Sequence, residues 1–229
     1  LYQLTLINGS APATGLYGGG AILNRSSGTL DLNQISLREN SSQSVGGAID
    51  NSGSARLTYV TLDANLASSE ESLYVAGGAI YNGGSLIVYN SLFFNNTASN
   101  PDGIDYGGGL FNDNTATLLN VTFSQNSAEW GGGIFHNGDE ANLYNVTFTD
   151  NSTAIHTAFS LRIKNSIVSN STAGVNCNGD GIITSLGHNI DSGTSCNFDI
   201  EGINPLLGSL ADNLGPIYTH ALLAGSPAI

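Results

Sequence analysis

Basic residues are scarce in this chain of 229 residues. It contains 5 Lys and Arg against 18 Asp and Glu, for a formal net charge of −13. Nucleic acids and anionic membrane surfaces are both recognised by clusters of positive charge. We therefore expect no nucleic-acid partner and no binding to an anionic bilayer. Charged residues make up only 10% of the chain, which also separates it from charge-rich disordered sequences.

Methionine and long hydrophobic runs are absent as well. No apolar run reaches the roughly 18 residues of a membrane span, so we expect no membrane insertion. No signal peptide is visible, and the opening residues LYQLTLING have the pattern of a strand interior, which predicts a processed or trimmed chain. The two cysteines, Cys177 and Cys196, lack metal-ligand spacing. They predict one disulfide in an oxidising compartment, with two buried free thiols as the alternative.

Glycine and asparagine, by contrast, recur in a repeated pattern. A glycine pair followed by an apolar residue and a nearby Asn places apolar anchors at Ile22, Ile49, Ile80, Leu110 and Ile134. An alternating apolar and polar motif follows at 33–37, 58–62, 89–93, 119–123 and 144–148, with a sixth copy at 164–168 and a half-copy at 2–6. Three residues after the last apolar position of each full repeat comes an Asn, at Asn40, Asn65, Asn96, Asn126 and Asn151.

The length of this repeat restricts the fold. Successive anchors lie 27, 31, 30 and 24 residues apart, too short for a propeller blade, and the unit has no helix of the leucine-rich or ankyrin kind. Three period-two stretches per unit predict three strands per turn. We therefore predict an all-β, single-stranded right-handed parallel β-helix of about seven coils over residues 1–176. The handedness follows the rule for parallel crossovers.

Stacked coils explain the recurring residue types. Equivalent apolar positions become interior stacks, and side-chain amides of Asn can hydrogen-bond along the axis as ladders. Glycine permits the positive φ that a sharp corner needs.

The pattern changes after residue 176. We predict an irregular C-terminal cap over 177–229, held by the disulfide. This stretch and the preceding coils resemble the choice-of-anchor Q family of bacterial right-handed β-helix surface proteins. The residues that match are Cys177, Ser185–Asn189, Asp191, Cys196, Pro205–Gly208, Leu210, Asp212–Asn213, Gly215–Pro216, Thr219–Leu223 and Gly225–Ile229. The chain departs from the family at Asn204 and Leu214, and it lacks the usual final Asp and C-terminal anchor. The resemblance implies an exported, surface-associated protein and no particular reaction.

Catalysis is the first alternative, because parallel β-helices also include pectate lyases and polygalacturonases. A lyase needs carboxylate-bound Ca²⁺ and a basic residue, and a glycoside hydrolase needs converging carboxylates. The cations are Arg25, Arg38, Arg56, Arg162 and Lys164, and none is paired in sequence with an acidic cluster. The histidines, at 136, 156, 188 and 220, are scattered, and His136 replaces a ladder residue. The sequence favours a protein that is not an enzyme and needs no cofactor.

Glycan binding is the second alternative. Tyr17, Tyr106 and Trp130 lie just ahead of glycine pairs, and Tyr74 lies three residues before Gly77. Together they predict a rough aromatic column. The neighbouring loops 63–76 and 94–106 carry Glu70, Glu71, Asp102 and Asp105, which predict an acidic rim able to bind Ca²⁺. The simpler interpretation is that the aromatic residues cover glycine corners and the acids are solvated turns.

Two further expectations concern the surface. Candidate glycosylation sites are Asn8, Asn24, Asn40, Asn95, Asn151 and Asn170, whereas the sequons at Asn120 and Asn145 are attributed to the strand motif. The open N-terminal coil and the apolar pieces NPLLGSL and THALLAGSPAI predict end-to-end assembly of copies into an extracellular filament. The favoured function is thus structural or adhesive at the cell exterior, with a monomeric fragment of a longer surface protein as the other possibility.

Overall fold

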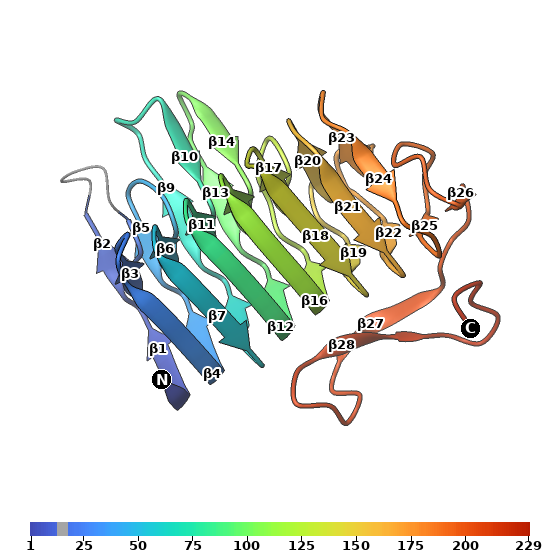
Figure 1. The fold of residues 1–229 in the computed structure, drawn as a ribbon, viewed down its shortest axis with the longest axis horizontal. Helices are drawn as coiled ribbons and strands as arrows, with labels where there is room; N and C mark the ends of the chain where they lie inside the picture. The colour runs from blue at the N-terminus through green and yellow to red at the C-terminus, as the bar shows by residue number, and fades with distance from the viewer. Residues whose placement is uncertain (13–17) are drawn as a thin grey trace.

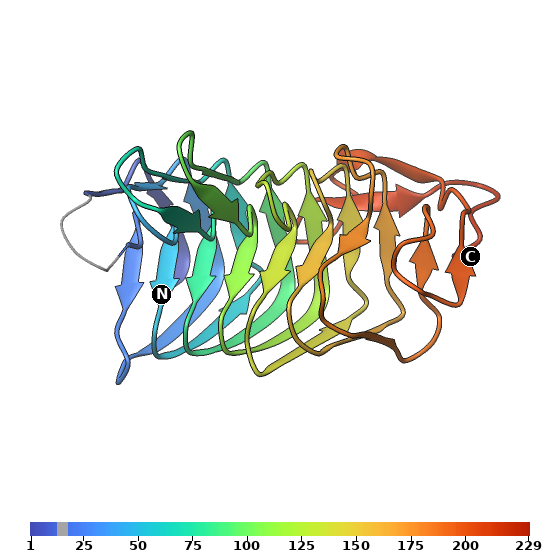
Figure 2. The same ribbon diagram turned by 90° about the horizontal axis from the view of Figure 1, so that it is seen from above.

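The computed structural model describes residues 1–12 and 18–229, and these residues form a parallel β-helix (Figures 1 and 2). Strands stack coil on coil along one axis, and all pairs within the coils are parallel. No helix that could cross a membrane occurs in the described ranges. The predicted all-β parallel solenoid is confirmed.

The coils are built from three stacked sheets. The long sheet has 13 strands: β1 (Tyr2–Ile7), β4 (Thr29–Arg38), β7 (Ser54–Thr58), β8 (Thr61–Asp63), β12 (Ser85–Phe94), β16 (Thr115–Ser124), β18 (Glu140–Tyr144), β19 (Thr147–Thr149), β21 (Leu161–Lys164), β22 (Ile167–Ser169), β24 (Ile183–Ser185), β25 (Ile190–Asp191) and β26 (Ile200–Glu201). The glycine sheet has seven: β3 (Ile22–Asn24), β6 (Ile49–Asn51), β11 (Ile80–Asn82), β15 (Leu110–Asn112), β17 (Ile134–His136), β20 (Ile155–Thr157) and β23 (Cys177–Asn178). The short sheet has four: β2 (Ser10–Ala11), β5 (Ser41–Ser42), β9 (Leu66–Ser68) and β13 (Thr97–Ser99).

Two pairs of strands lie outside these sheets. One is β10 (Tyr74–Ala76) with β14 (Ile104–Tyr106), which are parallel and precede the glycine sheet in their coils. The other is the antiparallel C-terminal hairpin of β27 (Leu207–Ala211) and β28 (Thr219–Leu222). Both pairs are visible at the periphery of the coil stack in Figure 1.

Each coil turns at corners where one residue has a positive φ. Before the glycine sheet this residue is glycine, as at Gly77 with φ +70°, and the next glycine is equally constrained because a Cβ on Gly78 would lie 2.3 Å from the Gly108 carbonyl oxygen. At the other two corners the residue with positive φ carries a side chain. Their residues include Asn90, Asn120, Asn145 and Asn165 in one column and Asn8, Asn95, Asp150 and Asn170 in the other. Asn and Asp tolerate this conformation best among residues with a Cβ, which explains their recurrence.

Apolar residues fill the interior as continuous stacks. Ile22, Ile49, Ile80, Leu110 and Ile134 pair in register, as predicted, and Ile155 and Cys177 continue the stack. Phe93, Phe123 and Phe148 stack ring on ring at centroid distances of 4.4 and 4.8 Å. Burial of each such side chain contributes roughly 1.5–3 kcal/mol, so the core supplies the main driving force for folding.

Two buried asparagine ladders run along the axis, as predicted. In the first, Asn24, Asn51 and Asn82 each donate from Nδ2 to the Oδ1 of the next member at 2.6–2.7 Å, and the run of asparagines ends at Asn112. In the second, Asn40, Asn65, Asn96 and Asn126 do so at 2.8–3.0 Å, and the run ends at Asn151. Buried amides must keep their hydrogen bonds, so the ladders fix the vertical register of the coils.

His136 occupies the ladder place after Asn112. Its Nδ1 accepts a hydrogen bond from Asn112 Nδ2 at 3.0 Å and one from the Gly138 N–H at 3.4 Å, while its Nε2 donates to the Ser160 carbonyl at 3.1 Å. Both partners of Nδ1 are hydrogen-bond donors. A second proton on the ring would sit on Nδ1 and would be repelled by these two N–H groups. Burial lowers the pKa of His136 below its ordinary value, against smaller opposing effects of the Ser160 and Asn112 hydrogen bonds.

This depressed pKa predicts acid sensitivity. Below the unfolded-state pKa of about 6.5 the unfolded chain binds a proton that the folded chain resists, so stability falls as pH falls through that value. His136→Asn, which restores a ladder amide, is expected to flatten the fall in Tm between pH 7 and pH 5. His156 also has a lowered pKa, so some slope remains. Equal slopes for variant and wild type in pH-resolved thermal melts would contradict the assignment.

Strand stacking continues past the predicted boundary at residue 176. β23, β24 and β25 pair with β20, β21 and β22, and β26 pairs with β25. Coil stacking therefore continues to Glu201, and the C-terminal hairpin follows it. The predicted Cys177–Cys196 disulfide is present, and both cysteines are buried in the main core beside Phe198.

The hairpin turns back along the outside of the coils. Its two apolar pieces pair with one another within the chain. His220 ties the hairpin down, since its Nδ1 bonds the Gly208 carbonyl oxygen at 2.7 Å and its Nε2 bonds Ser124 Oγ of β16 at 3.1 Å.

Candidate functional site

The residues expected to form an aromatic column do not all share a register. Tyr17 lies outside the described residues. Ahead of the glycines, the stacked positions are Val45, Ala76, Tyr106 and Trp130. Tyr74 is two residues earlier in its strand and pairs with Ile104. The single column proposed for Tyr74, Tyr106 and Trp130 is therefore wrong, because Ala76 fills the place assigned to Tyr74.

A different aromatic stack lies on the outward face of the glycine sheet. Tyr81, Phe111, Phe135 and His156 are in register on β11, β15, β17 and β20. Their rings are nearly parallel, with centroids 5.2, 5.3 and 4.8 Å apart. The motif gives the signal for this stack, since these residues follow the apolar anchor immediately. Tyr106 and Trp130 pack edge-on against the stack, Tyr106 on Phe111 and Phe135, and Trp130 on His156.

The β10–β14 pair and the aromatic stack border an open cleft of about 420 Å³, the size of a small ligand site. We call this the overhang cleft. Its lining comprises Leu73, Tyr74, Tyr81, Ile104, Tyr106, Phe111, Asp113, Phe135 and Asn137. Figure 1 shows β10 and β14 projecting beyond the glycine sheet. These strands belong to the two longest loops of the repeat, and their residues Tyr74, Ile104 and Tyr106 form one wall of the cleft.

Polar groups gather at one end of the overhang cleft. Asp113 and Asn137 each follow a glycine-sheet strand, and Asn137 Nδ2 donates to Asp113 Oδ1 at 2.9 Å. The Tyr81 hydroxyl lies 3.4 Å from Asp113 Oδ2. Burial raises the pKa of Tyr81, and the charge of Asp113 adds to the effect. Tyr81 is thus a neutral phenol and a hydrogen-bond donor at physiological pH.

The acidic residues of the neighbouring loops do not form a metal site. Among the described residues no group of three or more His, Cys, Asp and Glu side chains is placed to hold an ion. Asp105 accepts hydrogen bonds from the backbone N–H groups of Asn100 and Glu129, so its carboxylate organises the loop. Glu70 and Glu71 line a separate hollow in which Asp102 and Asp105 take no part. The expected calcium rim of Glu70, Glu71, Asp102 and Asp105 is therefore not assembled.

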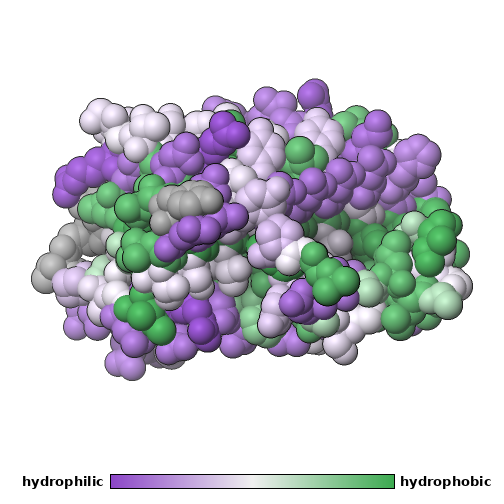
Figure 3. Space-filling model, turned by 90° about the horizontal axis from the view of Figure 1, so that it is seen from below, coloured by the Kyte–Doolittle hydropathy of each residue, from purple (hydrophilic) through white to green (hydrophobic). Residues whose placement is uncertain are grey.

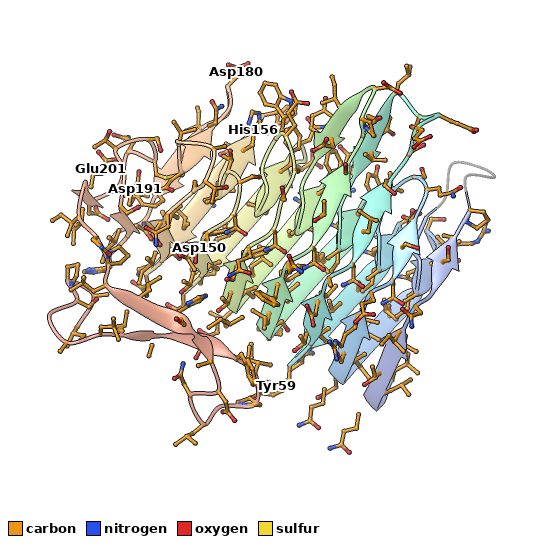
Figure 4. The ribbon with its side chains drawn as sticks, turned by 180° about the vertical axis from the view of Figure 1, so that it is seen from behind. Tyr59, Asp150, His156, Asp180, Asp191 and Glu201 are labelled. Atoms are coloured by element: carbon orange, nitrogen blue, oxygen red, sulfur yellow. A yellow bond between two sulfur atoms is a disulfide. The ribbon has the colours of Figure 1, made fainter. Side chains whose placement is uncertain are left out.

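The other ionisable residues are spread over the surface. Arg38 pairs with Asp63 at 3.1 Å, Arg162 with Glu140 at 3.6 Å, and Arg56 lies over the ring of Tyr89. Figure 4 shows His156 and Asp180 at the same edge of the coils, far from Tyr59. Burial lowers the pKa of His156, and the nearby charge of Asp180 opposes this.

Burial separates the sequons into two groups. Asn24, Asn40 and Asn151 are at most 7% exposed, and their side-chain amides take part in the ladder hydrogen bonds, so they cannot accept a glycan in the folded chain. Asn8, Asn95 and Asn170 are exposed and stay candidates. Asn120 and Asn145 are exposed as well, but Asn145 Nδ2 donates to Asn120 Oδ1 at 3.0 Å as part of an outer ladder.

Comparison with known families gives one short match. The Chlamydia polymorphic membrane protein repeat matches residues 120–137, from within β16 to the residue after β17. The matched stretch includes ladder residues Asn126 and His136 and cleft residues Phe135 and Asn137. It indicates a similar repeat and does not establish membership of that family. The choice-of-anchor Q resemblance is not confirmed. No curated protein and no solved structure matches the chain significantly.

Proposed function

We propose that this chain is a non-catalytic adhesive β-helix that acts outside the cell. The observation that carries the proposal is the overhang cleft. It is a ligand-sized hollow on a rigid scaffold, and it is built by loops that depart from the regular coil. The ladder bond between Asn82 and Asn112 and the stacking of Phe111 on Phe135 hold its floor in place.

The extracellular location has two supports. A buried disulfide is typical of proteins that fold in an oxidising compartment. The short similarity to a repeat of a Chlamydia polymorphic membrane protein is in keeping with display at an outer surface.

Binding without turnover is favoured by the composition of the cleft. Asp113 is the one carboxylate among its described lining residues, and it already bonds Asn137 and Tyr81. Glycoside hydrolysis ordinarily uses two carboxylates on opposite sides of the scissile bond. A polysaccharide lyase or hydrolase is therefore the less favoured function.

The direct test exposes the labelled chain to fixed bacterial cells, cellulose, chitin and pectate, with and without Ca²⁺. We expect saturable retention on at least one of these materials with no release of reducing or unsaturated sugars. The reduced, unfolded chain controls for nonspecific adhesion. Product release would refute the non-catalytic assignment, and an absence of retention on every material would refute adhesion.

A second candidate function, self-association, has a separate observation behind it. The C-terminal hairpin and the residues after it expose large apolar side chains: Leu214, Tyr218, Leu222, Leu223 and Ile229. Figure 3 shows hydrophobic surface at the C-terminal end of the molecule and further patches at the opposite end. Exposed apolar patches commonly mark contacts between proteins. We propose that copies of the chain associate through this hairpin, as the first step of end-to-end assembly.

Leu214 provides the test. It is 98% exposed and has a positive φ, which Asp tolerates better, so Leu214→Asp leaves the fold intact. We expect the wild type to form concentration-dependent oligomers in sedimentation velocity and the variant to shift toward monomer. Leu73→Asp, at a residue 89% exposed beside β10, is the matched control. A wild type that stays monomeric at all concentrations would rule out self-association.

A further inference from the structure

We propose that the overhang cleft binds a segment of a neutral polysaccharide, with a hexopyranose ring held against Tyr74. This inference rests on the proposed adhesive function and specifies its ligand. A pyranose ring is amphipathic, with C–H groups on its faces and hydroxyl groups around its rim. The overhang cleft has the complementary arrangement, apolar walls along its length and polar groups at one end.

The apolar wall is provided by the β10–β14 pair. Tyr74 is 49% exposed and Ile104 is 42% exposed, although both line the cleft. The rings of Phe111 and Phe135 stack on each other and are only 7% exposed, so they form a closed floor and offer no free face. Tyr106 is fixed edge-on above that floor, with its centroid 4.7 Å from that of Phe135. Tyr74 is thus the ring best able to accept the C–H face of a sugar.

The polar end supplies partners for hydroxyl groups. Asp113 Oδ1 accepts a hydrogen bond from Asn137 Nδ2, and Asp113 Oδ2 lies near the Tyr81 hydroxyl. Each of the two oxygens retains a free lone pair for a ligand hydroxyl. Asn137 adds a side-chain carbonyl that can accept a further hydrogen bond. Because Asp113 is held by these neighbours before a ligand arrives, little side-chain ordering is needed on binding.

Charge selects against acidic sugars. Asp113 lies within the cleft, and the chain has a formal net charge of −13. A uronate carboxylate placed at the polar end would face another carboxylate, and like charges at short range are unfavourable. In the described part of the chain no group of three or more His, Cys, Asp and Glu side chains is placed to hold a cation that would bridge to a uronate. The ligand that fits is therefore a neutral chain such as a glucan, mannan or chitin-type polymer.

Calorimetric titration of the folded chain with cello-, manno- and chito-oligosaccharides, and with oligogalacturonate, tests this inference. We expect at least one neutral oligosaccharide to bind and oligogalacturonate to bind far more weakly. Tyr74→Ala should weaken the neutral ligand about tenfold or more, as for truncation of an aromatic anchor. Asp113→Asn keeps the shape of the side chain but removes its charge. It should lower the affinity for neutral oligosaccharides and reduce the difference between their affinity and that of oligogalacturonate.

Tyr144→Ala is the matched control, because Tyr144 lies on β18 of the long sheet and does not line the cleft. It should leave affinity unchanged, and thermal melts of all variants should match the wild type. No binding of any neutral oligosaccharide, equal effects of Tyr74→Ala and Tyr144→Ala, or a preference for oligogalacturonate would each overturn the inference. If the chain still adheres to fixed cells in that case, the sugar specificity fails while the adhesive function stands.

Discussion

Replacing Asn96 with alanine is expected to lower the free energy of unfolding by about 4 kcal/mol, a large effect for one side chain. Asn96 lies in the middle of the second ladder and is fully buried. Its Oδ1 accepts hydrogen bonds from both the backbone N–H and the Nδ2 of Asn65. Its Nδ2 donates to Asn126 Oδ1 at 2.9 Å and to the Leu62 carbonyl at 3.0 Å.

Alanine removes every one of these bonds at once. The Asn65 N–H and the Leu62 carbonyl lose their side-chain partner in the interior, where water does not replace it. Asn65 Nδ2 keeps its bond to the Leu37 carbonyl, and Asn126 Oδ1 keeps its bond from the Asn96 backbone N–H. Each unsatisfied buried group costs about 1–3 kcal/mol, which is where the total comes from. A cavity of amide size adds to the loss, and partial relaxation of the coil reduces it.

Equilibrium urea unfolding of the wild type and Asn96→Ala measures the effect. The matched control is Asn142→Ala, because Asn142 is a half-buried residue on β18 whose amide bonds only the exposed Glu140 carboxylate. We expect the control to change stability by less than about 0.5 kcal/mol. Similar losses for the two variants would show that the ladder does not hold the coils together.

Removal of the disulfide is expected to produce the second large loss, about 3 kcal/mol. Cys177 and Cys196 are 19 residues apart in sequence, and their link restricts a glycine-rich segment of the unfolded chain. In the folded chain Cys177 continues the isoleucine stack above Ile155. The double variant Cys177→Ala and Cys196→Ala loses the link while keeping small apolar side chains at both positions.

Hydrogen exchange should locate this loss at the C-terminal coils. We expect amides of β23 to β25 to exchange faster in the double variant, while those of β6 and β11 keep most of their protection, since stacked repeats interact mainly with their neighbours. Denaturant unfolding gives the overall change. Free thiols in the unreduced, denatured wild type, or an unchanged midpoint in the variant, would contradict this expectation.

Much of the coil could be predicted because its signals repeat. Ile49, Ile80 and Leu110 each follow a glycine pair, and their recurrence places them in one stack without knowledge of any contact. The ladder asparagines recur in the same way, and the substitution at His136 was recognisable as a ladder position. The cysteine pair was predictable from composition and compartment alone.

The candidate site was predicted less well, and the reason is local. The loops that contain Tyr74 and Tyr106 have irregular sequence, so counting back from the glycines did not show which residues are level with one another. Pairing of β10 with β14 sets Tyr74 beside Ile104 and Ala76 beside Tyr106. The Asp105 carboxylate likewise accepts hydrogen bonds from the backbone N–H groups of Asn100 and Glu129 and so organises the loop. No sequence pattern predicted this role.

The features of the coil could be deduced from the order of residues: the alternation of side chains, the glycine and asparagine corners, the interior stacks and the partners of the disulfide. These features depend on each residue's own conformational preference and on repetition, and both can be recognised in the sequence. The position of the overhang cleft and the groups that meet in it follow from the folded arrangement. Tyr74, Tyr81, Asp113 and Asn137 come from three successive coils, and the cleft depends on how irregular loops pair across those coils. That pairing is set by backbone hydrogen bonds and packing between segments distant in sequence, for which a single sequence carries no periodic signal.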